Sequence, residues 1–520
     1  MPSQSELIRR FESAPLPELL KVIHRPNPDE AAALKVWLGT DRYETLRASA
    51  LQPRSRNRGT EKRRNVVVLH GIMGSELSVR DGNDDDKIWV NVWNLMRGRI
   101  KELRMGSDGQ PERQSFASDM MRKYYIGMLT GLARDHNVQP FWFDWRRDLK
   151  DSAAALDKAV QQWFGASSEV YFVGHSMGGL VVRTWIRDFR KRWEKGCRLV
   201  MLGTPNHGSF AIPQVITGAH KMVRMLALID LPTKLGSFTK TLNTFPGSVQ
   251  MLPSAHVMET MEPLYRAATW PDRGVSQGIL DRARRHHDSL TEIVDPERML
   301  YIAGVGHHTP CDFRDWSAMD RVEGYVFTPE GDGTVPHKLG FLENASGKVP
   351  VRFSRASHGD LPNDTKVIAA VGEYLTTGEV HSLGDKMTTT RELTRGKAAA
   401  LEVEAKWEAE IADFAARVQR NRSRSATDRT ADELRMEEAM MDGFLGNGSA
   451  DSTRGTSKES PTDTRKPSTP TKPPKTRTIE IAVRMEDIGT FGTKAVNGVP
   501  DVDFLTVGHY QGVEPQFAEL

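Results

Sequence analysis

Six short apolar segments, bounded by glycine or polar residues, constrain the fold of this 520-residue chain more than any other feature. Longer segments such as 153–164 and 179–193 separate them and have the apolar spacing of amphipathic helices. Short apolar runs of this kind are typical of buried parallel strands. We therefore predict an α/β core with a mainly parallel sheet. Its expected strands lie at 65–71, 139–145, 169–175, 198–204, 298–306 and 349–355.

The chain around these runs divides into regions of different character. Residues 1–60 carry apolar positions at helical intervals and end in a basic stretch, which predicts a helical N-terminal region suited to binding a protein partner. The core domain is expected over 61–380. Within it, the long stretch 206–297 interrupts the alternation of strands and helices, and we interpret it as an inserted helical cap.

The C-terminal part of the chain is predicted to contain three further segments. An amphipathic helix is expected over 391–420, a disordered linker rich in Ser, Thr, Lys, Arg and Pro over 421–476, and a small β-containing segment over 477–520. That last segment packs on the core, pairs with another chain or begins a larger domain, and the sequence leaves all three open. The apolar stripe of the helix consists of Val403, Trp407, Ile411, Phe414 and Val418.

Charge and cysteine content argue against several functional classes. The 71 Lys and Arg residues nearly balance the 68 Asp and Glu residues, so we expect no nucleic-acid partner. The two cysteines, Cys197 and Cys311, suit neither a disulfide framework nor a metal site. We therefore predict no metal, no cofactor and a cytoplasmic location. Neither a secretory signal nor an 18-residue apolar run is visible, so any membrane contact is expected to be peripheral.

The segment "YFVGHSMGGLVVRTW" at 171–185 contains the strongest candidate for a reactive residue, Ser176. A G-x-S-x-G pattern occurs by chance in long chains, but here an apolar run precedes it and a helical pattern follows. That is the strand, turn and helix context of a nucleophile elbow. Gly174 and Gly178 supply the small neighbours that such a turn needs, and Gly179 allows a close approach of the helix. We predict that Ser176 is a nucleophile.

A serine nucleophile requires a base to accept its proton and an acid to orient that base. In this architecture the acid and then the histidine follow at the ends of later strands. Asp332 lies in the glycine-rich turn "PEGDGTVPH", after the apolar segment 323–327, and His358 lies just after the run 349–355. We therefore predict Asp332 as the acid and His358 as the base.

The negative charge that develops during acyl transfer requires backbone N–H donors. Met177, the residue after the nucleophile, is expected to supply one donor. Ile72 is expected to supply the other, because the first predicted strand ends at His70-Gly71. His70 and His175 lie beside strand ends, and we interpret them as residues that support the turns rather than as bases.

Together, several motifs resemble the lecithin:cholesterol acyltransferase-like branch of the α/β-hydrolase lipases over about 65–378. They are "HGIMGS", "FDWR", "GHSMGG", "GTPNHGS", "GDGTVP" and "SHGD". The resemblance implies an α/β-hydrolase core and an enzyme acting on ester lipids. It also implies a structural ion pair between Asp144 and Arg146 of "FDWR". It further implies that Ser176 is the nucleophile, Asp332 the acid and His358 the base, with Ile72 and Met177 as the oxyanion donors. The disulfides and signal of the extracellular members are missing here, so their compartment and substrate do not transfer.

Two classes of function remain open at the level of sequence. The first is a serine lipase, phospholipase or acyltransferase, with water or an alcohol as the acyl acceptor. The second is a scaffold or interaction protein that carries a hydrolase fold, and a hydrolase of soluble esters is a further alternative. Fold alone does not decide between them.

The cap is the segment most suited to contact a lipid surface. Its residues around 211–238 combine Ile, Val, Leu and Met with Lys221, Arg224 and Lys234. Such a composition is typical of a helix lying between lipid and anionic headgroups. We expect Leu226, Leu228 and Ile229 to face lipid. The alternative is an ordinary packed cap helix.

Overall fold

The computed structural model describes residues 2–51, 63–82, 84–229, 235–270, 273–387, 396–422 and 429–445. All of these residues lie in one unit of the chain, Met1–Ser452. The β-containing segment predicted over 477–520 lies outside the described residues.

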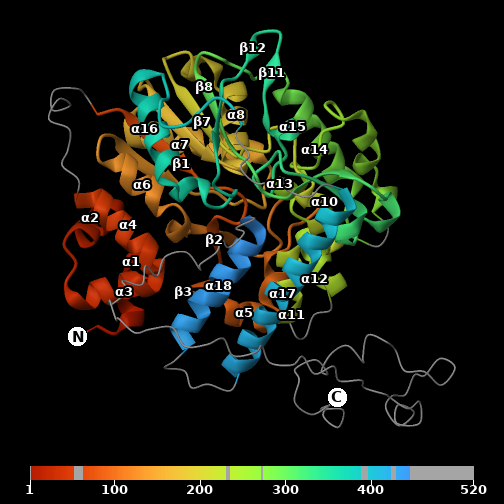
Figure 1. The fold of residues 1–520 in the computed structure, drawn as a ribbon, viewed down its shortest axis with the longest axis horizontal. Coiled ribbons are helices and arrows are strands. Elements are labelled where there is room, and N and C mark those ends of the chain that lie inside the picture. The colour runs from red at the N-terminus through yellow and green to blue at the C-terminus, as the bar shows by residue number, and fades with distance from the viewer. Residues whose placement is uncertain are drawn as a thin grey trace, which may run out of the picture. The chain divides into compact units, whose positions relative to one another are not determined.

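A six-stranded sheet forms the centre of the fold, and all its strands are parallel (Figure 1). The order across the sheet is β13-β8-β7-β6-β1-β5. Each strand overlaps one of the six runs predicted from the sequence, although β5 begins two residues earlier and ends four residues earlier than its run at 139–145. The predicted fold class is confirmed. Their bounds are β1 Asn65–Leu69, β5 Asn137–Phe141, β6 Val170–His175, β7 Arg198–Leu202, β8 Met299–Gly304 and β13 Val351–Ser354.

Two pairs of helices flank this sheet. Helix α7 (Leu149–Phe164) packs on α8 (Met177–Asp188), and α6 (Ile126–Ala133) packs on α16 (Thr365–Thr377). Local signals fix several of their ends. Asp148 and Asp364 cap the starts of α7 and α16 through their side chains, and Gly165 and Gly378 end these helices with positive φ angles.

Smaller sheets, which the sequence pattern does not indicate, lie beside the parallel sheet. The antiparallel sheet β3-β2-β4 consists of β2 (Ser75–Asp81), β3 (Asp84–Trp89) and β4 (Ser115–Met120). Strands β9 (Thr309–Phe313) and β10 (Tyr325–Thr328) pair, as do β11 (Glu343–Asn344) and β12 (Gly347–Lys348). The short helical segments here are α5 Val92–Met96, α9 Arg190–Trp193, α15 His337–Gly340, and the 3₁₀ helices Arg99–Leu103, Arg122–Tyr124, Trp316–Ala318, Val322–Gly324 and Leu361–Asn363.

The N-terminal region is helical, as its apolar spacing indicates. It consists of α1 (Gln4–Ser13), α2 (Leu16–His24), α3 (Pro28–Leu38) and α4 (Thr40–Leu51), drawn in red in Figure 1. Ser3 and Asn27 begin α1 and α3 with capping boxes. The apolar residues of these helices form their own cluster, which also takes in Ile126 of α6 and Leu434.

The insertion between β7 and β8 is helical, as predicted for the cap. Its helices precede the strand β8 in the order α10, α11, α12, α13, two 3₁₀ helices and α14. Their bounds are α10 Ala211–Thr217, α11 Lys221–Ile229, α12 Leu235–Leu242, α13 Pro246–Val249, the 3₁₀ helices Glu259–Tyr265 and Ala267–Thr269, and α14 Gln277–Leu290.

Two helices follow the core. Helix α17 (Gly396–Arg422) corresponds to the predicted amphipathic helix, and its Val403, Phe414 and Val418 are buried. Helix α18 (Arg429–Leu445) falls within the predicted linker, so that prediction is wrong for 429–445. The physical reason is a set of buried apolar side chains, Leu434, Met436, Met440 and Met441, whose burial offsets the entropy of ordering the segment. The rest of the predicted linker lies largely outside the described residues.

Helix α11 is covered by α17 and α18, which both pack against it (Figure 1). Lys221 forms an ion pair with Glu410 of α17, and Arg224 forms one with Glu404 at 2.8 Å. Leu226 is buried. The expectation that α11 presents its apolar and basic residues to lipid is therefore wrong for these residues, because a helix of the same chain contacts them.

The other residues expected to face lipid divide between two outcomes. Leu228 is 39% exposed and agrees with the expectation. The side chain of Ile229 and the residue Lys234 lie outside what the structure describes. Within the described part of the chain, none of the helices combines the length and apolar character needed to cross a bilayer.

Candidate active site

Ser176 lies in a tight turn between β6 and α8, with φ 52° and ψ −125°. A positive φ is uncommon for a residue other than glycine and is a feature of functional turns. The backbone around the turn is crowded. A Cβ atom on Gly174 would lie 2.6 Å from the Gly179 nitrogen, and one on Gly178 would lie 2.6 Å from the His70 carbonyl oxygen. The glycines of the motif are therefore required by the close approach of α8 to the sheet.

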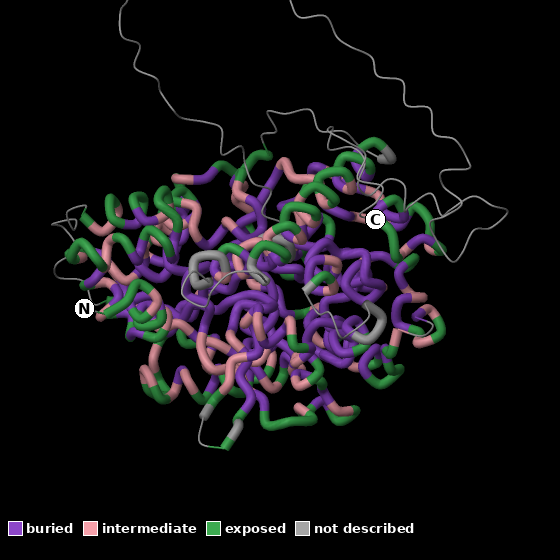
Figure 2. The backbone as a smooth tube through the Cα atoms, turned by 90° about the horizontal axis from the view of Figure 1, so that it is seen from below, coloured by how far each residue is buried: buried purple, intermediate pink, exposed green. Residues whose placement is uncertain are grey.

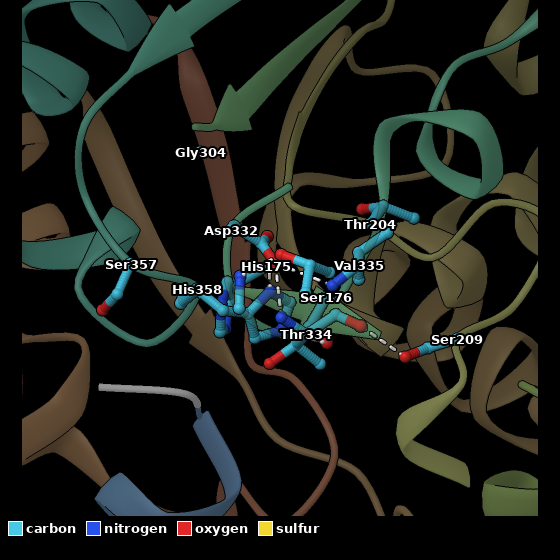
Figure 3. A network of polar contacts seen from close by, with 12 residues as sticks. His175, Ser176, Thr204, Ser209, Gly304, Asp332, Thr334, Val335, Ser357 and His358 are labelled. Carbon is cyan, nitrogen blue, oxygen red and sulfur yellow. Dashed lines mark hydrogen bonds and ion pairs between the residues drawn. The ribbon is translucent and has the colours of Figure 1, made fainter. Parts of the chain in front are cut away.

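The three residues predicted as acid, base and nucleophile come together in one line of hydrogen bonds (Figure 3). The Nδ1 atom of His358 lies 2.7 Å from Oδ2 of Asp332, and its Nε2 atom lies 3.0 Å from Oγ of Ser176. They come from separate places in the chain: Ser176 follows β6, Asp332 follows β10, and His358 follows β13. All three side chains are buried.

The environment of Asp332 favours its ionised form. Burial raises the pKa of this carboxyl, but the adjacent His358 and the N–H groups of Val335 and Thr334 outweigh burial and lower the pKa below its ordinary value. The Oδ1 atom accepts from Val335 N at 2.7 Å and from Thr334 N at 2.9 Å. A carboxylate fixed in this way accepts Nδ1–H of His358, which leaves Nε2 free to accept the proton of Ser176.

The loop after β1 lies directly against the serine. A Cβ atom on Gly71 would lie 2.8 Å from Cβ and 3.3 Å from Oγ of Ser176. The Gly71 carbonyl is oriented by His70 Nδ1 at 2.6 Å and by Gly74 N at 3.1 Å. Because C=O and N–H point in opposite directions across a trans peptide, these contacts also fix the direction of the Ile72 N–H.

The two predicted oxyanion donors are Ile72 and Met177. Met177 is the first residue of α8, so its N–H has no partner within the helix. Among the residues that the structure describes, no hydrogen bond is found for the N–H of Ile72 or Met177. The two predicted donors are thus unpaired among the described residues, and their role as an oxyanion hole stays a prediction.

Three contacts around the site are not indicated by the sequence pattern. A Cβ atom on Gly203 would lie 2.6 Å from Oδ2 of Asp332, and one on Gly304 would lie 2.4 Å from its Cβ. The hydroxyl of Tyr125 accepts a hydrogen bond from Gly71 N–H and forms another with the ring of His175. Gly203 belongs to the quoted "GTPNHGS" motif, which could have drawn attention to it, whereas Tyr125 stands in no motif.

Asp144 and Arg146 form an ion pair in the structure. Arg146 is fully buried and its Nε lies 2.9 Å from Oδ1 of Asp144. Its Nη1 also donates to the Leu103 carbonyl and to Ser115 Oγ, both at 2.8 Å. The guanidinium thus ties β4 and the segment before it to the end of β5.

The nucleophile and base of the candidate site are both buried. Ser176 is 3% exposed and His358 is fully buried. Figure 2 shows the buried residues in purple, which make up much of the interior of the fold. Within the described residues, no group of His, Cys, Asp and Glu is arranged to bind a metal ion.

A parallel sheet with a serine at the elbow after a central strand defines the α/β-hydrolase class of fold. Residues 127–288 match the family model described as "Lecithin:cholesterol acyltransferase". The chain therefore carries a domain of this family over that range, and the resemblance seen in its motifs is confirmed there. Of the five predicted site residues, the match covers Ser176 and Met177.

A curated relative and several solved structures are also similar to this chain. A Saccharomyces cerevisiae protein described as "Uncharacterized protein YJR098C" is 28% identical over 138 residues, which is 24% of this chain and 21% of that protein. The chain thus matches only about a fifth of that relative's length.

The solved structures are similar at low identity. The Tle4-Tli4 complex is 14% identical over 59% of this chain and 97% of that chain, with a TM-score of 0.41. Bacillus licheniformis lipase BlEst2 in its mature form is 14% identical over 60% and 91%, with a TM-score of 0.27. Phospholipase PlaB from Legionella pneumophila is 14% identical over 70% and 67%, with a TM-score of 0.28. No functional conclusion follows from likenesses at this level.

Proposed function

We propose that this protein is a serine-dependent lipase, phospholipase or acyltransferase that acts on lipid acyl esters through an acyl-enzyme on Ser176. One observation carries the proposal: the continuous contact from Asp332 through His358 to the Oγ of a serine at an elbow. Few other arrangements of buried polar side chains require this order, spacing and strained turn together.

In the proposed reaction His358 Nε2 removes the proton from Ser176 Oγ as the oxygen attacks the ester carbonyl. Asp332 orients the imidazole and stabilises its positive charge. The N–H groups of Ile72 and Met177 stabilise the oxyanion of the tetrahedral intermediate. His358 then protonates the leaving alcohol, and an ester with Ser176 remains. Water or a second alcohol attacks that ester in the return step, which gives hydrolysis or acyl transfer.

The lipid nature of the substrate rests on the family match over 127–288. The burial of Ser176 and His358 is compatible with it, because a nucleophile beneath a cover can be exposed when a lipid surface displaces that cover. We propose that the cap helices α10 to α14 form this cover. Since α17 and α18 contact α11, they must shift with it or separate from it.

The catalytic roles are tested by turnover of p-nitrophenyl butyrate. Ser176→Ala, Asp332→Asn and His358→Ala are each expected to lower kcat by about a thousandfold or more, with non-additive losses in the double variants. Ser152→Ala, which changes a buried serine in α7, is the matched control and should retain wild-type turnover. Wild-type turnover in His358→Ala would remove that residue from the mechanism.

The substrate class is tested by comparing phospholipid vesicles, with and without anionic lipid, against the same short-chain ester in solution. A lipid enzyme should become more active per mole of ester once its substrate aggregates. Activity on the soluble ester alone would favour a soluble-ester hydrolase. A folded wild-type protein that is inactive on every ester and unreactive toward fluorophosphonates would favour a scaffold.

A further inference from the structure

A single buried tyrosine hydroxyl connects the two loops on either side of Ser176. Gly71 N–H donates to Tyr125 Oη at 2.9 Å, and the same hydroxyl lies 3.0 Å from Nδ1 of His175. The other ring nitrogen of His175, Nε2, lies 2.9 Å from the backbone carbonyl oxygen of His358. We call this series, from Gly71 through Tyr125 and His175 to His358, the Tyr125 link.

The direction of every hydrogen bond in the Tyr125 link follows from its end points. A carbonyl oxygen only accepts, so Nε2 of His175 must carry a hydrogen and donate to His358. Burial lowers the pKa of His175 to about 3, so the ring is neutral and its Nδ1 has a lone pair. Tyr125 therefore donates its hydroxyl hydrogen to Nδ1, and its oxygen accepts from Gly71 N–H.

The two ends of the Tyr125 link belong to different parts of the proposed chemistry. Gly71 precedes Ile72, whose N–H is a proposed oxyanion donor. His358 is the proposed base. His175 immediately precedes the proposed nucleophile, Ser176. One line of hydrogen bonds thus passes from the oxyanion loop, past the elbow, to the loop of the base.

The space around the Tyr125 link permits little displacement. A Cβ atom on Gly74 would lie 2.9 Å from Tyr125 Oη, and one on Gly71 would lie 3.2 Å from Nδ1 of His175. The rings of His175 and His358 are 4.9 Å apart between centroids. Tyr125 and His175 are each 1% exposed, so bulk solvent does not reach the hydroxyl and the ring nitrogens.

We propose that Tyr125 and His175 are positioning residues that hold the oxyanion donor at Ile72 and the base His358 in one fixed geometry around Ser176. The inference rests on the proposed function, because it assigns these residues a role in the same acyl transfer. Loss of the tyrosine hydroxyl would leave both Gly71 N–H and His175 Nδ1 without a partner, so both loops would lose a constraint at once. An error of a fraction of an ångström at either loop lowers the rate of the chemical step.

The test is Tyr125→Phe, which removes one oxygen atom and keeps the ring. We expect kcat on p-nitrophenyl butyrate to fall by about 10- to 100-fold with KM within about twofold of wild type. The rate is divided by the concentration of active sites, titrated with a fluorophosphonate. A purely structural role would lower the titrated fraction or the melting temperature and leave kcat per site unchanged. A trifluoromethyl ketone inhibitor, which mimics the tetrahedral intermediate, should weaken in parallel with kcat.

Tyr325→Phe is the matched control. Tyr325 is fully buried in β10, and its hydroxyl donates to the Met319 carbonyl at 2.8 Å, away from the site. Both variants remove one oxygen atom from a buried ring, but Tyr125→Phe breaks two hydrogen bonds beside Ser176 and Tyr325→Phe breaks the one to Met319. We expect Tyr325→Phe to retain wild-type kcat per site.

Two variants of His175 test the end of the Tyr125 link at His358 separately from the end at Gly71. In His175→Gln the side-chain amide can still donate to the His358 carbonyl, whereas His175→Leu has no donor. We expect His175→Gln to retain several-fold more activity per site than His175→Leu. Adding Tyr125→Phe to His175→Leu should lower kcat per site much less than Tyr125→Phe lowers it in the wild type, because the link is already interrupted.

The outcomes distinguish this inference from the proposed function. Wild-type kcat per site in Tyr125→Phe, or full additivity with His175→Leu, would overturn the positioning role while Ser176→Ala still abolishes turnover. If Ser176→Ala remains fully active, the proposed function fails, and the positioning role fails with it.

Discussion

Glycine residues set how closely the loops of the candidate site approach one another. Gly71 faces Ser176, while Gly203 and Gly304 face Asp332, and at each position an added Cβ would lie within 3 Å of a site residue. Such contacts are closer than carbon atoms tolerate without displacement. The geometry of the triad therefore depends on the absence of side chains as well as on the three residues themselves.

Gly203→Ala tests this dependence. The new Cβ would lie 2.6 Å from Oδ2 of Asp332 and 2.9 Å from Nδ1 of His358, at a φ of 55°. We expect kcat per site to fall by about tenfold or more, because the contact between acid and base is displaced. The measurement is turnover normalised by active-site titration.

Gly39→Ala controls for backbone strain. Its φ is 83°, and nothing lies within 4 Å of the added atom. This variant should lose about 1–3 kcal/mol of stability and no turnover per site. Equal kcat values for the Gly203→Ala and wild-type proteins would show that the acid and base tolerate displacement.

At the level of elements, α17 contacts the cap helix α11 through oppositely charged side chains. Its acidic residues Glu404 and Glu410 face the basic residues Arg224 and Lys221 of α11. The Lys221 side chain is only 6% exposed. A buried ammonium group that loses its carboxylate partner is costly, whereas an exposed pair contributes little.

Glu410→Gln is therefore expected to destabilise the protein by about 1–3 kcal/mol, measured by urea unfolding. The matched change on the same helix is Asp413→Asn, which breaks the exposed pair with Arg417 at 2.7 Å. That variant should change stability by less than about 0.5 kcal/mol. A smaller effect for Glu410→Gln than for Asp413→Asn would contradict the docking of α17 on α11 described above.

Helices and strands that depend on one local sequence pattern are predictable from the sequence. Most of the six core strands are predictable because they contain short apolar runs, as in the fully buried β6 and β8. Strands β5 (NVQPF) and β13 (VRFS) are less apolar and include polar residues. Strand β3 is not predictable, because its Asp84, Asp85 and Asp86 lack an alternating pattern. Helix α18 is not predicted because the Ser- and Pro-rich sequence after it dominates the composition of 421–476.

The site was predictable in part for a similar reason. Ser176, Asp332 and His358 each follow an apolar run in the order that the fold requires. Tyr125 stands 50 residues before its partner His175 and 54 after Gly71, and no periodicity relates them. The covering of α11 is equally long-range, since Lys221 and Glu410 are 189 residues apart. Contacts of this kind depend on the assembled fold.

At the scale of the whole molecule, several fully buried histidines couple stability to pH. Burial lowers the pKa of His70 and His287 to about 4 and that of His175 and His220 to about 3. In the unfolded chain the same side chains titrate near 6.5. Between these values the unfolded state binds more protons than the folded state, so stability decreases as pH falls from about 6.5 toward 4.

We expect the free energy of unfolding to decline between pH 7.5 and pH 5.5, with each such histidine contributing up to about 1.4 kcal/mol per pH unit well below 6.5. Urea unfolding at a series of pH values measures the slope. His220→Asn should reduce it, while His381→Asn, which changes a histidine with a 76% exposed side chain, should leave it unchanged. A free energy of unfolding that is constant from pH 7.5 to 5.5 would contradict this account.

The most direct test of the central claim is to identify the residue that reacts with a fluorophosphonate. The wild-type protein is labelled, digested and mapped by mass spectrometry, with Asp332→Asn labelled in parallel. We expect one phosphonylated residue, Ser176, and much slower labelling of Asp332→Asn, because the base is no longer oriented by a carboxylate. Labelling of another serine with Ser176 unmodified, or equal labelling rates in the two proteins, would contradict it.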